Sequence, residues 1–271
     1  MWQANQLILV KGGGDLGTGV AWRLFLAGFP VVVTEIADPL VIRRAVAFAS
    51  AVWAGRVAVE GAEAVRIDSP ADARSALDAG RVPVLVDPAA GCRESLQPQV
   101  VVDAIMSKRN EGTRMTDAPL VVALGPGFEA GVDCHAVVET QRGHTLGRVY
   151  WRGRALDDTG TPGRVLSHDA ERVLRAPCDG KLRAHRSIGD AVQAGDLIAE
   201  VAGQPIRAPF AGVVRGLIRD GHAVTAGLKV GDVDPRGEPS HCFTISDKAL
   251  AIGGAALFAI MAWAAQGQLQ D

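Results

Sequence analysis

Short apolar runs alternate with amphipathic stretches through the first half of the chain. The apolar runs are rich in Val, Leu and Ile without polar alternation, as expected for strands buried on both faces of a parallel sheet. These predicted strands are Leu7–Val10, Val31–Glu35, Val82–Val86, Val100–Ala104 and Leu120–Leu124. The stretches between them with a helical pattern are Thr18–Ala27, Leu40–Val52 and Pro70–Leu77. We therefore expect an α/β fold, with a Rossmann-like parallel sheet covered by helices over residues 1–170.

The second half changes to short β segments separated by glycine, and it contains a repeat. Arg175-Ala176-Pro177 recurs as Arg207-Ala208-Pro209, and Ala191-Val192 recurs as Ala223-Val224 in the same register, without a gap. Two copies of so short a unit cannot each bury a core, so we expect them to interlock as one pseudo-symmetric domain.

This repeat resembles the biotinyl/lipoyl-type barrel-sandwich domain, in which two such halves close into a flattened β-barrel. The resemblance predicts a small all-β domain over residues 171–237. Carrier members of that group place a modifiable lysine in the turn that joins the halves. The corresponding turn here, Ala202-Gly203-Gln204-Pro205, has no lysine. A structural or docking module is therefore expected rather than a swinging arm.

Residues 238–271 form a third part that ends in an apolar segment. The run Ala249–Ala265 carries no charge and contains Gly253-Gly254. It is shorter than the ~20 residues that a membrane span requires. We expect a C-terminal helix that packs back on the first domain or on a partner subunit, which would allow a homo-oligomer, and no membrane contact.

Charge and composition exclude several classes of protein. The chain has 28 Lys and Arg against 30 Asp and Glu, a net charge of −2, and only 5% aromatic residues. That balance offers neither a basic surface nor a stacking platform for nucleic acid. Its four cysteines include no CxxC pair, and no basic region leads a long apolar stretch at the N-terminus. We expect a cytoplasmic protein without a structural metal.

The first predicted strand leads into a glycine-rich loop. Gly12, Gly14 and Gly17 fit the pattern GxGxxG, with Asp15 at the start of the following helix. Such a loop presents backbone N–H groups and a helix N-terminus to a diphosphate. Glu35 ends the second predicted strand, where an acid that binds ribose is expected, and it favours an NAD-like over an NADP-like ligand. The alternative is a glycine turn retained for packing.

A second glycine loop, with Gly125 and Gly127, follows the last predicted strand of the sheet. The polar residues after it include His135, Glu139, Arg142 and His144. Near such a loop they could bind an anion and move protons. The alternatives are a buried strand residue for His135 and a solvated ion pair for Glu139 with Arg142. Their spacing matches no metal-binding template, so no metal is expected.

Further candidates lie outside the two loops. Asp103 and Lys108 follow a buried strand and could reach the same crevice, while Arg43-Arg44 could add positive charge or form a solvated basic face. Cys242 follows His241 and could be a thiol of lowered pKa. Together these residues suggest an anionic substrate.

Several short stretches, in order along nearly the whole chain, resemble one family. They are Gly13–Val20, Val33–Ile36, Val41–Arg44, Val84–Pro88, Thr116–Val121, Gly125–Phe128, Glu139–His144 and Cys242–Lys248. The family is the accessory proteins of the selenium-dependent molybdenum hydroxylase system. The resemblance implies a role in maturing a molybdenum hydroxylase, at its molybdopterin cofactor or its labile selenium. The partner would then be the apo-hydroxylase.

On this interpretation the crevice holds an NAD-like nucleotide or a molybdopterin nucleotide. One alternative is a non-catalytic cofactor chaperone or scaffold that docks on the apo-hydroxylase. Another is an NAD-dependent oxidoreductase unrelated to molybdenum, since the glycine pattern and a distal acid are what such an enzyme needs. The sequence leaves open whether the protein is an enzyme.

Overall fold

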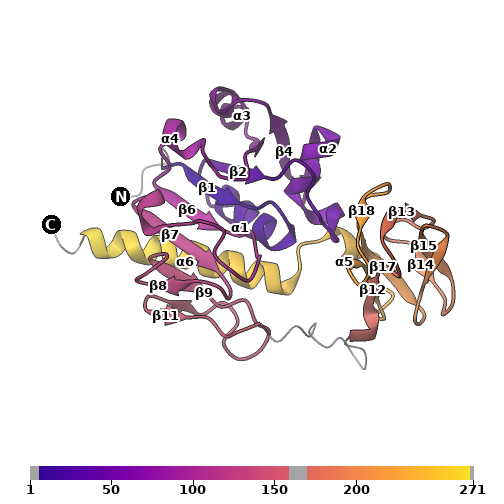
Figure 1. Ribbon diagram of the computed structural model, residues 1–271. Helices are drawn as coiled ribbons and strands as arrows, with labels where there is room; N and C mark the ends of the chain where they lie inside the picture. The colour runs from indigo at the N-terminus through magenta and orange to yellow at the C-terminus, as the bar shows by residue number, and fades with distance from the viewer. Residues whose placement is uncertain (1–5, 159–169, 269–271) are drawn as a thin grey trace. The chain divides into compact units, whose positions relative to one another are not determined.

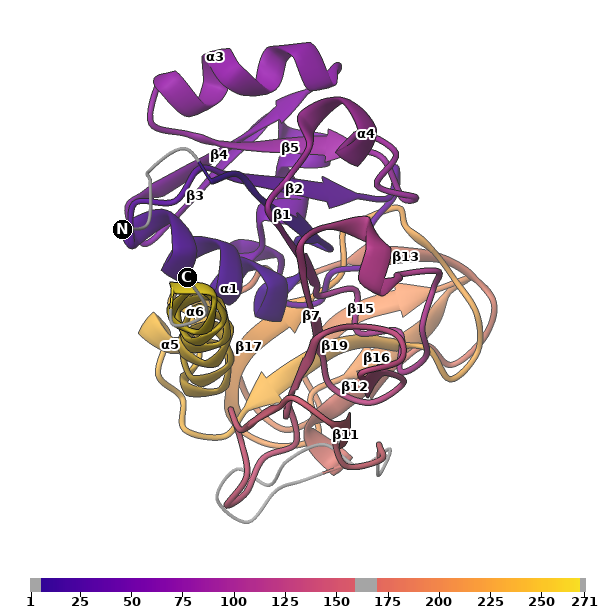
Figure 2. The ribbon, with the colours of Figure 1, turned by 90° about the vertical axis from the view of Figure 1, so that its left-hand side faces the viewer.

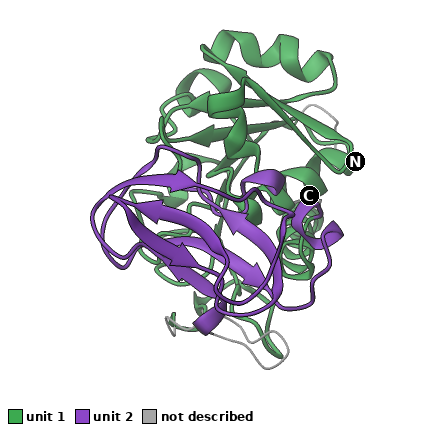
Figure 3. Cartoon of the chain, turned by 90° about the vertical axis from the view of Figure 1, so that its right-hand side faces the viewer, with its two compact units in different colours: residues 1–39, 47–159, 245–271 green, residues 40–46, 160–244 purple. Residues whose placement is uncertain are grey.

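A computed structural model describes residues 6–158 and 170–268 of the chain (Figure 1). Its contacts divide the chain into two compact units, coloured separately in Figure 3. Unit 1 comprises residues 1–39, 47–159 and 245–271, and unit 2 comprises residues 40–46 and 160–244. Each unit is therefore assembled from segments that are distant in the sequence. The short segment 40–46 belongs to unit 2, although the sequence suggested that it continued the first domain.

Unit 1 is built on a nine-stranded mixed sheet with strand order β10-β9-β7-β6-β1-β2-β5-β4-β3. The strands are β1 (Ile8–Lys11), β2 (Val31–Glu35), β3 (Arg56–Val59), β4 (Ala62–Ile67), β5 (Val82–Val86), β6 (Val100–Asp103), β7 (Leu120–Leu124), β9 (Ala136–Val138) and β10 (Val149–Tyr150). The central pairs are parallel, whereas β3 pairs antiparallel with β4, and β10 pairs antiparallel with β9. The prediction of a Rossmann-like, wholly parallel sheet is wrong, because a hairpin closes each edge.

Both faces of this sheet are buried. Leu9 and Val32 face a core that includes Ala73 and Ala76 on α3 (Ala73–Asp78), with Leu96 on α4 (Arg93–Leu96) packed against it. The neighbouring Ile8, Val10, Val31 and Val33 are also fully buried. Side chains alternate between the faces of a strand, so these residues face the opposite side. Helices α1 (Asp15–Leu26) and α6 (Asp247–Gln268) lie side by side, and α6 also contacts β7, β9 and β10 (Figure 2).

Glycine allows α1 and α6 to approach closely. A methyl group on Gly19 would lie 2.8 Å from the Ala249 carbonyl oxygen, and one on Gly253 would lie 2.5 Å from the Gly19 carbonyl oxygen. Helix α6 is long and apolar enough to cross a membrane, yet Ala249, Ile252 and Ile260 are fully buried in unit 1. Unit 1 thus has the construction of a soluble domain, in which α6 is a packing helix.

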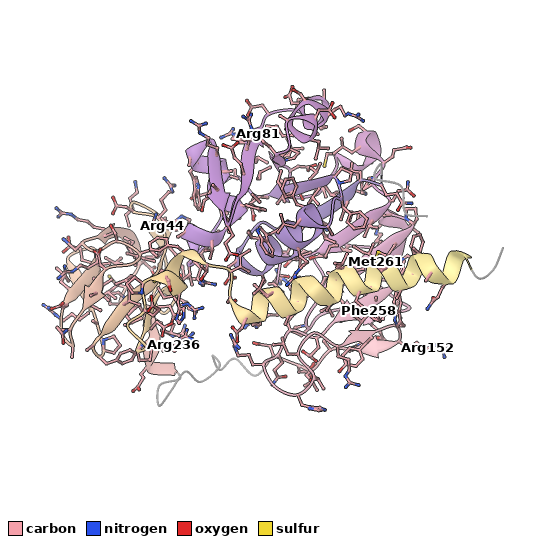
Figure 4. All side chains as sticks on the ribbon, turned by 180° about the vertical axis from the view of Figure 1, so that it is seen from behind. Arg44, Arg81, Arg152, Arg236, Phe258 and Met261 are labelled. Atoms are coloured by element: carbon pink, nitrogen blue, oxygen red, sulfur yellow. The ribbon has the colours of Figure 1, made fainter. Side chains whose placement is uncertain are left out.

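One side of α6 stays exposed. Phe258 is 59% exposed and Met261 is 44% exposed, and both are labelled in Figure 4. Self-association through this helix remains a prediction.

The predicted helix Leu40–Val52 is wrong. The segment instead holds two short 3-10 turns and a single helical turn: η1 (Arg44–Val46), η2 (Phe48–Ser50) and α2 (Ala51–Ala54). The reason is tertiary, because the Ile42 carbonyl accepts a hydrogen bond from Leu217 N–H in unit 2. This hydrogen bond ties Ile42 to β17 (Gly212–Leu217) instead of to a helical turn of its own segment.

The predicted helix Pro70–Leu77 is observed as η3 (Pro70–Asp72) followed directly by α3. The Ser69 hydroxyl caps η3 by accepting from Ala71 N–H, and the Asp72 carboxylate accepts from Ser69 N–H, which completes a capping box. The remaining small elements of unit 1 are η4 (Met115–Asp117) and a ribbon of β8 (Glu129–Ala130) with β11 (Gly153–Arg154).

Unit 2 consists of two four-stranded antiparallel sheets, β12-β19-β17-β14 and β16-β15-β13-β18. The strands are β12 (Val173–Arg175), β13 (Gly180–Ala184), β14 (Ala191–Val192), β15 (Leu197–Val201), β16 (Gln204–Arg207), β17 (Gly212–Leu217), β18 (Ala223–Val224) and β19 (Lys229–Asp234). Among the described residues the two sheets share no paired strand. The expected closed biotinyl/lipoyl-like barrel is therefore not observed.

The sequence repeat is visible in the strands of unit 2. Strands β13, β14 and β15 of the first copy correspond to β17, β18 and β19 of the second. Strand β14 pairs with β17, and β18 pairs with β13, so each sheet contains strands of both copies. Their inward side chains form one core, with Leu182, Ile198, Leu217 and Val230 almost fully buried. The unit also contains η5 (Ala170–Arg172) and α5 (Ser240–Phe243).

Candidate functional site

The topology of unit 1 marks one place for a ligand. The chain proceeds from β1 to β2 and β5 on one side, while β6, β7 and β9 lie on the other side of β1. The strand order therefore reverses between β1 and β6. In open α/β sheets, ligands bind outside the carboxyl ends of the strands at such a switch point. The loops after β1 and β6 are thus the first residues to inspect.

The glycine loop after β1 is tightly packed except at Gly14. Gly12 has a φ of +91°, and a methyl group there would lie 2.9 Å from the Ala104 carbonyl oxygen after β6. A methyl on Gly17 would overlap the Gly12 carbonyl oxygen, whereas one on Gly14 would meet nothing within 4 Å. Gly12 and Gly17 serve packing, as in the alternative interpretation of the motif, and Gly14 borders open space.

Gly14 is the N-cap of α1, and as a glycine it has no side chain with which to cap the helix. The first N–H groups of a helix have no partner within the helix, and they carry partial positive charge. Asp15 occupies the first turn, where an acid is favourable. An uncapped turn beside open space leaves these N–H groups available to an oxyanion.

Glu35 does not extend into this space. One carboxylate oxygen accepts a hydrogen bond from Gly13 N–H at 2.8 Å, and the other accepts one from Ile36 N–H at 2.8 Å. Burial raises the pKa of Glu35, and these two hydrogen bonds oppose that change. The carboxylate thus holds the glycine loop in place. The predicted contact with a ribose stays a prediction, and the observed contact is with the loop itself.

A buried polar network joins the ends of β1 and β6. The Lys11 ammonium lies 3.4 Å from a carboxylate oxygen of Asp103, with side chains only 6% and 1% exposed. Thr113 bridges the two, since its hydroxyl accepts from Lys11 and donates to Asp103. The other Asp103 oxygen accepts from Ile105 N–H. Asp103 therefore fixes the loop after β6 from inside the protein, rather than presenting a free carboxylate.

The loop after β6 is conformationally strained beside the second glycine loop. Met106 and Lys108 have positive φ values of 63° and 67°, which side chains other than glycine rarely adopt. A methyl group on Gly127, whose φ is +99°, would lie 2.6 Å from the backbone nitrogen of Arg109. Strain of this kind clusters at functional sites. Lys108 itself forms an ion pair with Asp158 at 2.5 Å.

Gly125 has a different role in the second loop. A methyl there would lie 2.5 Å from the Thr140 hydroxyl oxygen, so this glycine, like Gly12, is required by close packing.

The polar residues after the second loop are separated rather than gathered. Glu139 is fully buried, and its two oxygens accept from Gln141 N–H and Leu156 N–H, both at 2.8 Å. Arg142 forms a bidentate ion pair with Asp247, both contacts at 2.7 Å. The predicted pairing of Glu139 with Arg142 is not observed.

The two histidines also lie apart. His135 accepts a hydrogen bond from Val121 N–H through Nδ1, and burial lowers its pKa. It lies just before β9 and is only partly buried, so it is not the buried strand residue of the alternative interpretation. His144 lines a separate pocket with residues 145–149, Ala255 and Phe258.

Lys248 is a residue that the sequence did not single out. It lies in the first turn of α6, within electrostatic range of Asp15 and Glu139. Burial lowers its pKa, and Arg142 lowers it further, whereas Asp15 and Asp158 raise it. Within the described ranges it makes no hydrogen bond or ion pair. The sequence signal was its position beside the cap of the last helix, where Ser246 accepts from Ala249 N–H.

Three of the four cysteines, Cys92, Cys134 and Cys242, are buried. Burial raises the pKa of Cys92 and of Cys134 to about 12. Cys242 is fully buried in unit 2, and burial also raises its pKa although Arg215 and Arg43 oppose that shift. This is opposite to the lowered pKa expected for a reactive thiol. Arg43 lies in unit 2, where it donates to the carbonyls of His241 and Thr244.

The described residues offer no set of side chains that could ligate a metal ion. Over residues 6–158 and 170–268, no group of three or more His, Cys, Asp or Glu side chains could hold a metal ion.

Comparison with known proteins gives one relative of high identity. The chain is 49% identical over 263 residues to YqeB of Escherichia coli K12, which is described as an uncharacterized protein. The match covers 97% of this chain, but the chain spans only about half (49%) of the length of that relative. No family model matches the sequence.

Solved structures give distant likenesses. The ectoine utilization protein EutE (DoeB) of Ruegeria pomeroyi, in its product-bound structure, is 15% identical with a TM-score of 0.25, covering 84% of this chain and 85% of its own. An aspartoacylase family protein of Mesorhizobium loti is 12% identical with a TM-score of 0.27, covering 84% of each chain. Both scores are low, so neither protein guides the assignment of an activity.

These comparisons correct the family assignment. These structural matches are ectoine utilization, aspartoacylase and desuccinylase proteins, and the sequence relative is uncharacterized, so they do not point to a selenium-dependent molybdenum hydroxylase system. The resemblance to that accessory family is therefore wrong. The predicted role in maturing a molybdenum hydroxylase is therefore wrong as well. The same holds for the scaffold and NAD-dependent oxidoreductase alternatives. A function can therefore be argued only from the geometry of the site.

Proposed function

We propose that unit 1 binds a phosphate-bearing small molecule, such as an NAD-like nucleotide, at the carboxyl ends of β1 and β6. The observation that carries this proposal is the uncapped turn of α1 at Gly14, which borders open space at the switch point of the sheet. Its N–H groups would bind phosphate oxygens.

Lys248 supplies the mobile charge of this site. Around it, Lys108 pairs with Asp158 and Arg142 pairs with Asp247, while Glu139 is satisfied by two backbone N–H groups. Lys248 is the remaining cation there that has no hydrogen bond within the described part of the chain. A partly buried ammonium that makes no hydrogen bond is stabilised when an anion binds beside it.

The loops around Gly14 are held rigidly. Glu35 fixes Gly13, Lys11 and Asp103 fix the strand ends, and Ala49 N–H donates to the Gly13 carbonyl at 2.8 Å. A site whose donors are already oriented loses little entropy when its ligand binds. We also expect the protein to act in the cytoplasm, where buried thiols such as Cys92 and Cys134 stay reduced.

Calorimetry with ADP and with NAD on the full chain tests this function. Gly14→Ala adds a methyl group that the unliganded fold accommodates, since Gly14 has a φ of −61° and free space around it. We expect Gly14→Ala and Lys248→Gln each to weaken nucleotide binding by about tenfold or more. The matched controls are Gly254→Ala, another glycine with open space, and Lys181→Gln on unit 2.

Two results would contradict the proposal. One is that neither ADP nor NAD binds the wild-type chain. The other is an affinity that is the same in Gly14→Ala and Gly254→Ala.

A further inference from the structure

Unit 2 contains a cluster of arginines that the site in unit 1 does not use. Arg172 precedes β12, Arg215 lies within β17, and Arg236 follows β19, while Arg43 comes from the segment 40–46. The carboxylates among them are Asp232 and Asp234 of β19. Four guanidinium groups therefore meet two carboxylates, which leaves an excess of positive charge. Figure 4 labels Arg236 at this part of unit 2.

The carboxylates satisfy Arg236 but leave Arg172 and Arg215 with unused hydrogen-bond donors. Asp234 is committed to Arg236, which binds both of its oxygens at 2.9 and 2.5 Å. Arg215 approaches Asp234 only to 3.6 Å and makes no hydrogen bond among the described residues, and Arg172 lies 3.3 Å from Asp232.

Because Arg172 and Arg215 are buried, their missing hydrogen bonds raise the free energy of the folded protein. Arg172 is 9% exposed and Arg215 is 8% exposed. The buried Nε atoms of both residues and Nη1 of Arg172 have no hydrogen-bond partner. Leaving a buried charged donor unsatisfied costs several times more than an ordinary hydrogen bond contributes.

The backbone directs Arg215 into the cluster. In the pairing of β17 with β19, Val214 faces Val233 and Gly216 faces Asp232, so Arg215 is an extra residue at a β-bulge. Bulges re-aim a side chain and are frequent beside functional sites. Arg43 lies close enough to Arg215 to lower its pKa by repulsion, after burial as the main cause.

From this arrangement we infer that unit 2 binds a compact oxyanion, a phosphate or a phosphate group of a larger molecule, between Arg172 and Arg215. Guanidinium groups bind phosphate oxygens through paired N–H donors, which would use the unsatisfied nitrogens. A dianion would also neutralise the excess of two positive charges. This site is separate from the one proposed at Gly14.

Calorimetry with inorganic phosphate on the full chain, carrying Lys248→Gln to remove the cation of unit 1, tests the inference. Sodium chloride of equal ionic strength corrects for screening. We expect Arg215→Gln and Arg172→Gln each to weaken phosphate binding by about tenfold or more. Arg183→Gln, whose parent side chain is 72% exposed in the same unit, should leave it unchanged.

The variant Asp232→Asn distinguishes a loss of phosphate-binding groups from a loss of folding. It removes a negative charge beside both arginines, so phosphate should bind several-fold more tightly, which a loss of folding could not produce. Phenyl phosphate, tested in parallel, separates the two sources of the anion. Its binding indicates the phosphate group of a larger molecule, and its exclusion while phosphate binds indicates the free ion.

The inference is overturned if inorganic phosphate does not bind the Lys248→Gln chain. It is equally overturned if Arg215→Gln and Arg172→Gln bind phosphate as tightly as Arg183→Gln does.

Discussion

Gly253 of α6 lies directly against Gly19 of α1, so that a methyl group on Gly253 would be 2.5 Å from the Gly19 carbonyl oxygen. Neither helix could approach the other this closely with a larger residue at the crossing. The contact holds α6 on the sheet, and it sets the position of Lys248 one turn earlier on the same helix.

Gly253→Ala should destabilise unit 1 by about 1–3 kcal/mol, because the new methyl forces the two helices apart. The adjacent Gly254→Ala is the control, since it meets nothing within 4 Å. It should stabilise the protein by about 0.5–1 kcal/mol through the better helix propensity of alanine. Urea denaturation of the two variants measures both effects. Equal stabilities would show that the helices do not pack as described.

Lys248 should make the stability of the protein depend on pH. Burial lowers the pKa of Lys248 in the folded protein below the ordinary lysine value of 10.5. At pH values between this lowered pKa and 10.5, the unfolded chain therefore binds more protons than the folded one. Stability therefore rises with pH through that window. Relative to Lys248→Met, the wild-type protein should gain stability as the pH increases toward 10.5. Urea titrations at a series of alkaline pH values give this difference, and a difference that stays constant would contradict the assignment.

Asp103 should be essential for stability rather than for chemistry. Asp103→Ala leaves the Lys11 ammonium buried without its counter-ion, which we expect to cost about 3–5 kcal/mol. Combining Lys11→Met with Asp103→Leu removes both charges and should recover part of the loss. Denaturant unfolding gives each value. A change below about 1 kcal/mol for Asp103→Ala would mean that the pair is not buried as the distances indicate.

The thiols should differ sharply in reactivity. Burial holds the pKa of Cys92 and Cys134 at about 12, and Cys242 is fully buried. Cys178 is partly exposed. A maleimide reagent at neutral pH should therefore label Cys178 first in the native protein, as measured by mass spectrometry. Cys178→Ser should remove the fast phase, and rapid labelling of Cys242 would instead show an activated thiol.

The sequence predicted the central strands well, because strands buried on both faces read as uninterrupted apolar runs. Val31–Glu35, Val82–Val86 and Leu120–Leu124 appear with the predicted bounds. The hairpin β3–β4 was missed because it is half exposed and carries Arg56, Glu63 and Arg66 among its apolar residues. Its turn is marked by positive φ at both Glu60 and Gly61, a conformation that pattern reasoning did not detect.

The sequence predicted where the candidate site lies, but not the role of each residue in it. The glycine pattern predicted a loop at the carboxyl end of a strand, and Gly12, Gly14 and Gly17 do follow β1. It could not show that Gly12 and Gly17 are needed for packing and that only Gly14 borders open space. Nor could it place Lys248 beside Asp15, because that proximity depends on how α6 packs against α1.

The division of unit 1 into three stretches of sequence has a consequence for biosynthesis. Helix α1 emerges from the ribosome well before α6, the helix that shields its glycine surface. Until then the nascent chain exposes Leu24, Val122 and their neighbours, which the finished protein buries completely. We expect this exposed apolar surface to favour aggregation of the chain until α6 has been made.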